Sequence, residues 1–140
     1  MSDKLYQEEL MEHYRYPQNI KPLTNPHFSA TESNPSCGDS MYIEGYINDN
    51  AISNLCFKGS GCVISQATAS MLTQKCIGSS LIMVRSLSQS DIVELIGIEL
   101  GPVRLKCALL SLHVLQRGIS QIIDVDNNVK QIISCKGESL

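Results

Sequence analysis

Three of the six cysteines lie in sequence surroundings that favour metal binding or sulfur chemistry. Cys37 precedes a glycine in a loop-like segment, Cys62 follows Gly59-Ser60-Gly61, and Cys107 comes shortly after Pro102. Cys62 and Cys107 are each expected near the N-terminus of a helix, where free N–H groups and the helix dipole stabilise a thiolate. Soft metal ions and sulfur transfer both require thiolates. These three cysteines are therefore candidate metal ligands or sulfur acceptors.

Asp39 is a candidate fourth ligand because it follows Cys37 by two residues. In an extended loop its carboxylate can point at the same centre as the Cys37 thiolate, although an aspartate here could instead only cap a turn. Three thiolates and one carboxylate suit zinc or an iron–sulfur centre. An oxygen ligand is displaced from a soft centre more easily than a thiolate, which would help a protein that hands its cluster on.

Lys106 stands directly before Cys107. It is either a solvated helix residue or a positive charge that favours the Cys107 thiolate and helps a persulfide form, and the sequence leaves both readings open. Three further cysteines have no motif around them and are expected to be packing thiols: Cys56, Cys76 and Cys135. His13 is expected to pack the N-terminal helix against the domain, whereas His27 and His113 are not ligand candidates.

Composition indicates one globular domain. The chain has 140 residues, of which 43% are apolar and 18% charged, with a net charge of −3. This length can bury a core, and the negative charge argues against nucleic-acid binding. The N-terminus is too polar for a secretory signal and the apolar run at residues 81–84 is too short to span a bilayer. We therefore expect a cytoplasmic protein with no membrane partner, in which cysteines are packing residues or ligands.

The candidate residues are positioned by helices, a loop and a hairpin. The helical repeat predicts helices over residues 4–16, 62–75, 80–95 (with a break at 88–90) and 102–117, and Gly118 is expected to end the last of them. Alternation on both sides of a turn at residues 48–50 predicts strands at 41–47 and 51–58. The expected organisation is a single α+β domain: N-terminal helix and loop 1–36, sheet 40–58, helices 62–118, and an uncertain tail 120–140 that is a hairpin or loose.

Four segments together resemble a known family. Asn34-Pro-Ser-Cys-Gly-Asp39, Gly59-Ser-Gly-Cys-Val-Ile-Ser65 and Gly101-Pro-Val-Arg-Leu-Lys-Cys-Ala-Leu-Leu110 are similar, in this order, to the three signature segments of the IscU/NifU/SufU scaffold family. His13-Tyr-Arg-Tyr-Pro-Gln-Asn19 resembles its N-terminal segment. Together the segments span residues 6–118 in the right order, so the set is far more specific than a lone Cys-Gly-Asp would be.

The resemblance implies a fold, a site and partners. It implies an IscU/SufE-like fold, in which a small antiparallel β-sheet is packed by α-helices, with the site at one exposed end. It implies that Cys37, Asp39, Cys62 and Cys107 hold iron or a [2Fe–2S] cluster, and the same ligands can hold zinc in the purified protein. Cys107 is expected to be a principal sulfur acceptor, because Lys106 adjoins it and the last helix begins nearby. The resemblance further implies a cysteine desulfurase as sulfur donor and apo-proteins as cluster acceptors.

Two departures bear on the subfamily. IscU-type members have a histidine where this chain has Lys106, which is the residue of SufU-type members. SufU-type members usually have an insertion between the second and third cysteines, but Cys62 and Cys107 are close to the uninserted spacing. The segment Leu100-Gly-Pro-Val-Arg104 resembles the Leu-Pro-Pro-Val-Lys stretch by which IscU-type scaffolds engage an Hsp70-type chaperone, with one proline and the lysine replaced.

Three functions are consistent with these residues. The first is a non-catalytic scaffold that accepts sulfur from a desulfurase, binds iron and passes on a [2Fe–2S] cluster. The second is a SufU-like zinc-dependent sulfurtransferase, which Lys106 favours and the short spacing between Cys62 and Cys107 disfavours. The third is a structural zinc module, which an oxygen ligand in an exposed loop makes the weakest of the three.

Overall fold

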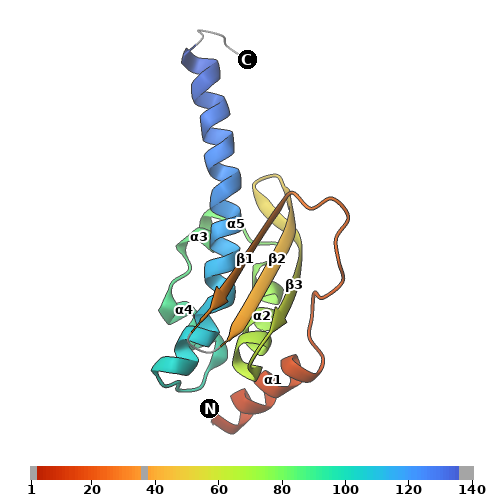
Figure 1. Ribbon diagram of the computed structural model, residues 1–140, viewed down its shortest axis with the longest axis vertical. Coiled ribbons are helices and arrows are strands. Elements are labelled where there is room, and N and C mark those ends of the chain that lie inside the picture. Colours follow the sequence, from red (N-terminus) through yellow and green to blue (C-terminus); the bar gives the residue numbers. More distant parts are fainter. Residues whose placement is uncertain (1–2, 36–37, 136–140) are drawn as a thin grey trace.

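The computed structural model describes the backbone of residues 3–35 and 38–135 and the side chains of residues 4–35 and 38–122. One helix precedes three strands and four helices follow them (Figure 1). The elements are α1 (Asp3–Arg15), β1 (Phe28–Asn34), β2 (Asp39–Asn48), β3 (Ala51–Ser60), α2 (Val63–Cys76), α3 (Leu81–Ser86), α4 (Gln89–Ile96) and α5 (Pro102–Cys135). Within the described residues, no helix is long and apolar enough to cross a membrane.

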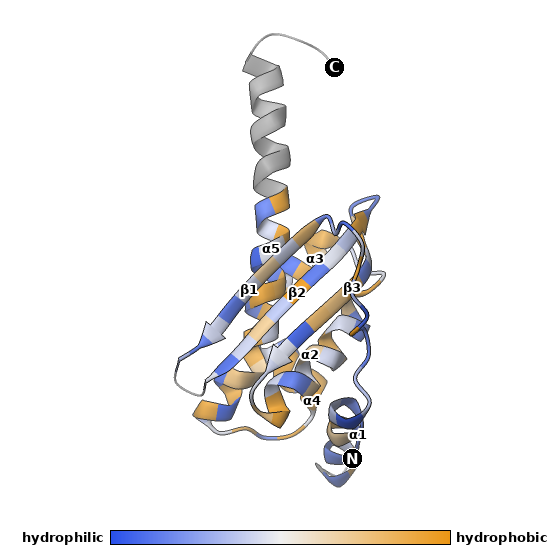
Figure 2. Cartoon of the chain, turned by 45° about the vertical axis from the view of Figure 1, so that its right-hand side comes forward, coloured by the Kyte–Doolittle hydropathy of each residue, from blue (hydrophilic) through white to orange (hydrophobic). Residues whose placement is uncertain are grey.

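The three strands form an antiparallel sheet in the order β1-β2-β3. Helices α2 and α5 contact the sheet and each other, and together they form the layer behind it (Figure 1). The strands carry both hydrophilic and hydrophobic residues along their length (Figure 2), as expected when one sheet face covers a core. Met41 and Ile43 of β2 are fully buried on that face. The predicted α+β class is confirmed.

The predicted hairpin is confirmed as β2 and β3. Asp49 and Asn50 at its tip have φ angles of 56° and 61°. Two successive residues with positive φ are what a two-residue hairpin turn requires, and aspartate and asparagine tolerate that conformation better than most residues.

Strand β1 corrects the prediction that residues 17–36 are only loop. Phe28 and Ala30 are buried, while Ser29 and Thr31 between and after them are exposed. With only two apolar residues and prolines close by, this alternation was too short to predict a strand. The strand forms because β2 supplies its hydrogen-bonding partner, from Phe28 opposite Gly45 to Asn34 opposite Asp39.

Helix α5 corrects the prediction that the last helix ends at Gly118 and, for residues 120–135, the prediction of a hairpin or a loose tail. Residues 136–140 lie outside the described residues. The backbone stays helical from Pro102 to Cys135, and α5 extends past the end of the sheet (Figure 1). Gly118 has a packing reason instead, because a Cβ there would lie 2.8 Å from Cδ2 of Phe28. The glycine lets α5 approach β1 closely rather than ending the helix.

The predicted break in the stretch 80–95 is confirmed between α3 and α4. Ser88 and Asp91 form a capping box, in which the Ser88 N–H donates to Asp91 Oδ2 at 2.7 Å. This hydrogen bond lowers the pKa of the Asp91 carboxyl. A new helix therefore starts at Gln89, because the capping box provides acceptors for the backbone N–H groups of Ser88 and Asp91 at its N-terminus.

Candidate metal centre

Three of the four predicted site residues meet at one end of the sheet. Asp39 begins β2, Cys62 is the residue before α2, and Cys107 lies in the second turn of α5. One ligand atom of each lies within 4.8 Å of those of the other two. Asp39 and Cys107 are 1% and 3% exposed, and Cys62 is half-buried. The segments that contain these residues are far apart in the sequence, and the fold brings them together.

Asp39 and Cys62 are joined by their own hydrogen bonds. The backbone N–H of Cys62 donates to Asp39 Oδ1 at 2.9 Å, and the Cys62 thiol donates to Asp39 Oδ2 at 3.3 Å. The first bond holds the carboxylate at the start of α2. It leaves Oδ2 directed toward the Cys62 sulfur, so an ion bound there would meet both atoms at once.

Gly61 makes this arrangement sterically feasible. Its φ is +128°, and a Cβ at this position would lie 1.9 Å from Asp39 Oδ1. No other amino acid allows the backbone to pass so close to the carboxylate. Gly61 therefore lets the backbone before Cys62 approach the Asp39 carboxylate closely.

Ser65 is a site residue that the sequence analysis did not single out. It is fully buried, and its hydroxyl donates to the Cys62 carbonyl at 3.0 Å. The Cys62 sulfur lies 3.8 Å from the same hydroxyl oxygen. Ser65 therefore fixes the turn that presents Cys62. The signal was its position three residues after a cysteine that precedes a helix, where a serine often bonds back to the backbone.

The donor set fits a thiophilic metal ion or an iron–sulfur centre. Two sulfur atoms and a carboxylate converge from β2, α2 and α5, and sulfur-rich sets select zinc and iron–sulfur centres over magnesium or calcium. Cys37, the fourth predicted ligand, lies outside the described residues. Its neighbour Gly38 has a φ of +74°, a turn conformation that glycine adopts without strain.

Lys106 is exposed. It is not part of the Asp39–Cys62–Cys107 group, and it does not line the cavity whose wall contains Cys62 and Cys107. That Lys106 is only a solvated helix residue, or that its charge favours the Cys107 thiolate, both remain predictions.

The cysteines predicted to be packing thiols differ from Cys62 in their surroundings. Cys76 is 1% exposed and part of the hydrophobic core, and burial raises the pKa of its thiol to about 11. Burial, and then the neighbouring Glu44 carboxylate, also raises the pKa of the Cys56 thiol. Both thiols stay protonated at neutral pH and are poor ligands. The side chain of Cys135 lies outside the described residues.

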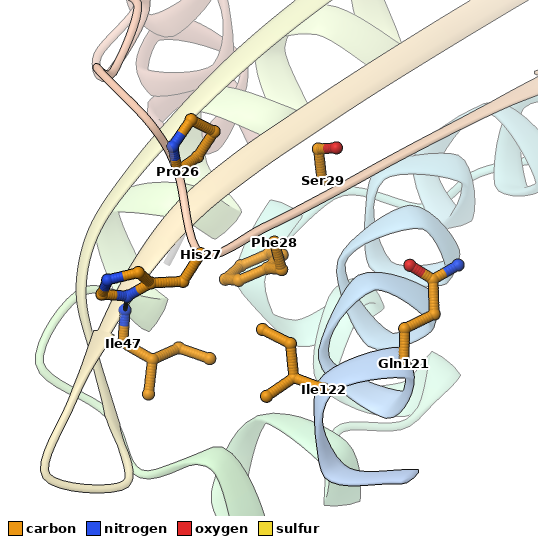
Figure 3. Close-up of a pocket in the computed structure, with 7 residues that line it drawn as sticks. All are labelled: Pro26, His27, Phe28, Ser29, Ile47, Gln121 and Ile122. Atoms are coloured by element: carbon orange, nitrogen blue, oxygen red, sulfur yellow. Dashed lines mark hydrogen bonds between the residues drawn. The ribbon is translucent and has the colours of Figure 1, made fainter. Parts of the chain in front are cut away.

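None of the three histidines joins the described cluster. The prediction for His13 is confirmed, since its Nδ1 lies 2.7 Å from the hydroxyl of Ser70 and ties α1 to α2. His27 Nδ1 accepts from the Ile47 N–H at 2.8 Å, at a cavity of about 620 Å³ (Figure 3). That cavity lies at the other end of the β1–β2 pair from Asp39, because Phe28 in its wall pairs with Gly45. His113 is exposed.

Comparisons with known proteins identify the family of the chain. The family model described as "NifU-like N terminal domain" matches residues 5–127. The zinc-dependent sulfurtransferase SufU of Bacillus subtilis (strain 168) is 32% identical over 136 aligned residues, covering 85% of this chain and 92% of that protein. The iron-sulfur cluster assembly scaffold protein IscU of Escherichia coli (strain K12) is 30% identical over 119 residues, covering 82% and 91%.

Solved structures show the same fold. A putative iron-sulfur cluster assembly scaffold protein for the SUF system from Fervidobacterium islandicum AW-1 superposes with a TM-score of 0.72 at 21% identity, covering 85% of this chain and 99% of that one. A NifU-like protein (N-terminal) from Brucella abortus gives 0.71 at 19% identity, covering 87% and 96%. The resemblance found in the sequence is confirmed, and the chain belongs to the NifU-like N-terminal domain family.

Proposed function

We propose that this protein is a scaffold on which an iron–sulfur cluster is assembled before it passes to acceptor proteins. The observation that supports this most directly is the convergence of Asp39, Cys62 and Cys107 within 4.8 Å. Membership of a family with relatives named as cluster assembly scaffolds supports it further. Cys37 is proposed as the fourth ligand, on the sequence resemblance. A cytoplasmic location stays a prediction.

In this proposal the chain's residues divide the work between sulfur capture and cluster release. The Cys107 thiolate attacks the outer sulfur of a persulfide on a cysteine desulfurase. A sulfur–sulfur bond forms at Cys107, and the donor's thiolate leaves with the electron pair of the broken bond. Asp39 supplies the ligand that an incoming thiolate displaces most easily, since a carboxylate binds a soft centre less strongly than sulfur does.

A zinc-dependent sulfurtransferase is the second candidate. Lys106 and the 32% identity to the SufU relative favour it. The same four residues would hold zinc, which would keep the thiolates deprotonated and ordered. Elemental analysis and the visible spectrum of protein purified without oxygen separate the candidates, because an iron–sulfur cluster absorbs visible light and zinc does not. In both cases a desulfurase is the proposed donor. An Hsp70-type chaperone is a further proposed partner, for segment 100–104, of which residues 101–104 are exposed.

Asp39→Ala tests whether the carboxylate is the release ligand. We expect the visible absorbance of the cluster to decay more slowly than in wild type, and transfer to an apo-ferredoxin to slow. A structural zinc module predicts the opposite sign for the bound centre, namely weaker metal binding and a lower Tm, because a lost ligand removes folding energy. Asp39→Asn is the matched control, since its amide oxygen can still accept from the Cys62 N–H. Faster decay in Asp39→Ala would count against the release role.

Cys107 is expected to be a principal sulfur acceptor. After incubation with a desulfurase and cysteine, mass spectrometry of peptides should find one added sulfur atom on Cys107. Cys76, whose thiol pKa is about 11, should stay unmodified, because the thiol and not the thiolate is present at neutral pH. Sulfur found only on Cys56 or Cys135 would refute the assignment.

A further inference from the structure

A second cavity of about 620 Å³ lies directly beside the metal centre. Residues of α1, of the start of α2 and of the start of α5 line it, and its wall includes both Cys62 and Cys107. Its volume falls in the range of small-molecule sites, which is roughly 300 to 1,000 Å³. The two thiols are thus within reach of a molecule bound in the cavity as well as of a partner protein.

The lining of this cavity has an amphipathic character. Apolar side chains from three elements form most of it, including Leu10 and Met11 of α1, Val63 of α2 and Val103 of α5. Among the described lining residues, Arg104 is the one charged group. Its guanidinium can pair with a carboxylate.

Helix α1 forms one wall of this cavity and is held in place by contacts with the rest of the domain. Leu10 is 4% exposed, so α1 is seated on the domain at that point. Farther along, His13 contacts the Ser70 hydroxyl at 2.7 Å, and the same hydroxyl accepts from the Gln18 N–H at 2.8 Å. The hydroxyl of Ser70 in α2 thus contacts both His13 in α1 and Gln18 just after α1, and these contacts hold α1 against α2.

We propose that the cavity binds a small amphipathic thiol in its persulfide form, with its apolar body against Leu10, Met11 and Val103, its carboxylate at Arg104, and its sulfur at Cys107. The inference rests on the proposed function, since it assumes that Cys107 accepts sulfur. It adds a low-molecular-weight sulfur donor to the protein donor.

The step balances without an added oxidant or reductant. The Cys107 thiolate attacks the terminal sulfur of the bound persulfide, and a bond forms between that sulfur and Cys107 Sγ. The sulfur–sulfur bond of the donor breaks, and its inner sulfur leaves as a thiolate that takes up a proton from water. One sulfur atom moves from the small molecule to the protein, and the number of thiol groups is conserved.

Thiol-reactive probes of graded length test the cavity on the full chain after removal of metal with a chelator. The rate of modification at Cys107, mapped by peptide mass spectrometry, is compared for N-methylmaleimide and N-hexylmaleimide, each relative to its rate with free cysteine. We expect at least about a tenfold advantage for the hexyl probe, because buried methylene groups bind more tightly. Val103→Asn should remove most of that advantage, while Val93→Asn, an exposed valine away from the cavity, should keep it.

The charge requirement is tested with two probes of equal length. 6-Maleimidohexanoate should react about two- to fivefold faster than its neutral amide, the gain expected of an exposed ion pair. Arg104→Gln should abolish this ratio. Lys106→Gln should retain it, since Lys106 is also exposed on α5 but does not line the cavity. The ratio divides out any effect of Lys106 on the thiol itself.

Transfer is tested directly with the persulfide of 6-sulfanylhexanoate. It should place sulfur on Cys107 at least several times faster than the persulfide of sulfanylacetate does. Equal rates for long and short probes, or an advantage that Val103→Asn leaves intact, would overturn the inference. If Cys107 takes sulfur from a desulfurase but shows no length dependence, the inference fails alone. If it takes none from a desulfurase, the proposed function fails as well.

Discussion

Replacing Cys62 or Cys107 with serine is expected to abolish stable binding of iron, zinc or a cluster. Each sulfur is one of the converging ligand atoms of the site, and serine is a much poorer ligand for soft metals than a thiolate. Cys37→Ser is expected to do the same, on the sequence resemblance. Metal content per folded chain, measured after anaerobic reconstitution, gives the result.

The matched controls are Cys56→Ser, Cys76→Ser and Cys135→Ser, which should all retain metal. Cys76→Ser is expected to lower the free energy of unfolding by about 1–3 kcal/mol, since it buries a hydroxyl in the core. For this reason metal content has to be related to the folded fraction, taken from circular dichroism. Loss of metal in Cys76→Ser with retention in Cys62→Ser would overturn the site assignment.

Gly61→Ala is expected to weaken the equilibrium binding of Zn²⁺, a different quantity from the lifetime of a bound cluster, by about tenfold or more, an effect of the size seen when groups that orient a ligand are lost. The new Cβ would lie 1.9 Å from Asp39 Oδ1, so the carboxylate or the backbone must move. The positive φ of +128° adds backbone strain of about 1–3 kcal/mol. A titration with Zn²⁺ against a competing chelator measures the affinity, and thermal unfolding measures the strain.

Gly78→Ala separates the two effects. Gly78 also has a positive φ, of +91°, but a Cβ there would have nothing within 4 Å. Its substitution should therefore lower Tm through backbone strain and leave metal affinity unchanged. Equal affinities in Gly61→Ala and Gly78→Ala would show that the contact with Asp39 has no part in holding the site.

Sequence alone predicted the parts of the fold whose signals are local. The β2–β3 hairpin follows from strand alternation on both sides of an Asn-Asp-Asn turn, and the start of α5 follows from Pro102. Strand β1 was missed because its stability comes from pairing with β2, which follows it in the chain, rather than from its own two apolar residues. Gly118 was misread as a helix end because its reason, contact with Phe28, involves a distant segment.

For the site too, the residues could be predicted from the sequence, but the contacts between distant segments could not. The residue types and the resemblance predicted Asp39, Cys62 and Cys107 as site residues, but not the two hydrogen bonds that join Asp39 to Cys62. The sequence drew attention to Lys106 because it is adjacent to Cys107. In a helix, however, residues three apart share a face and adjacent ones do not, and it is Arg104 that lines the cavity together with Cys107.

The three described site residues lie in β2, directly before α2 and in α5, and this has a thermodynamic consequence. A ligand held by Asp39, Cys62 and Cys107 at once binds the folded chain more tightly than the unfolded one, in which these residues are not brought together. Occupancy therefore stabilises the whole domain, by up to about 2.7 kcal/mol at a free concentration one hundred times Kd. Delivery of the cargo withdraws that stabilisation in a single step. The empty protein is then the less stable of the two forms in each cycle, and it is the form on which local unfolding and proteolysis act.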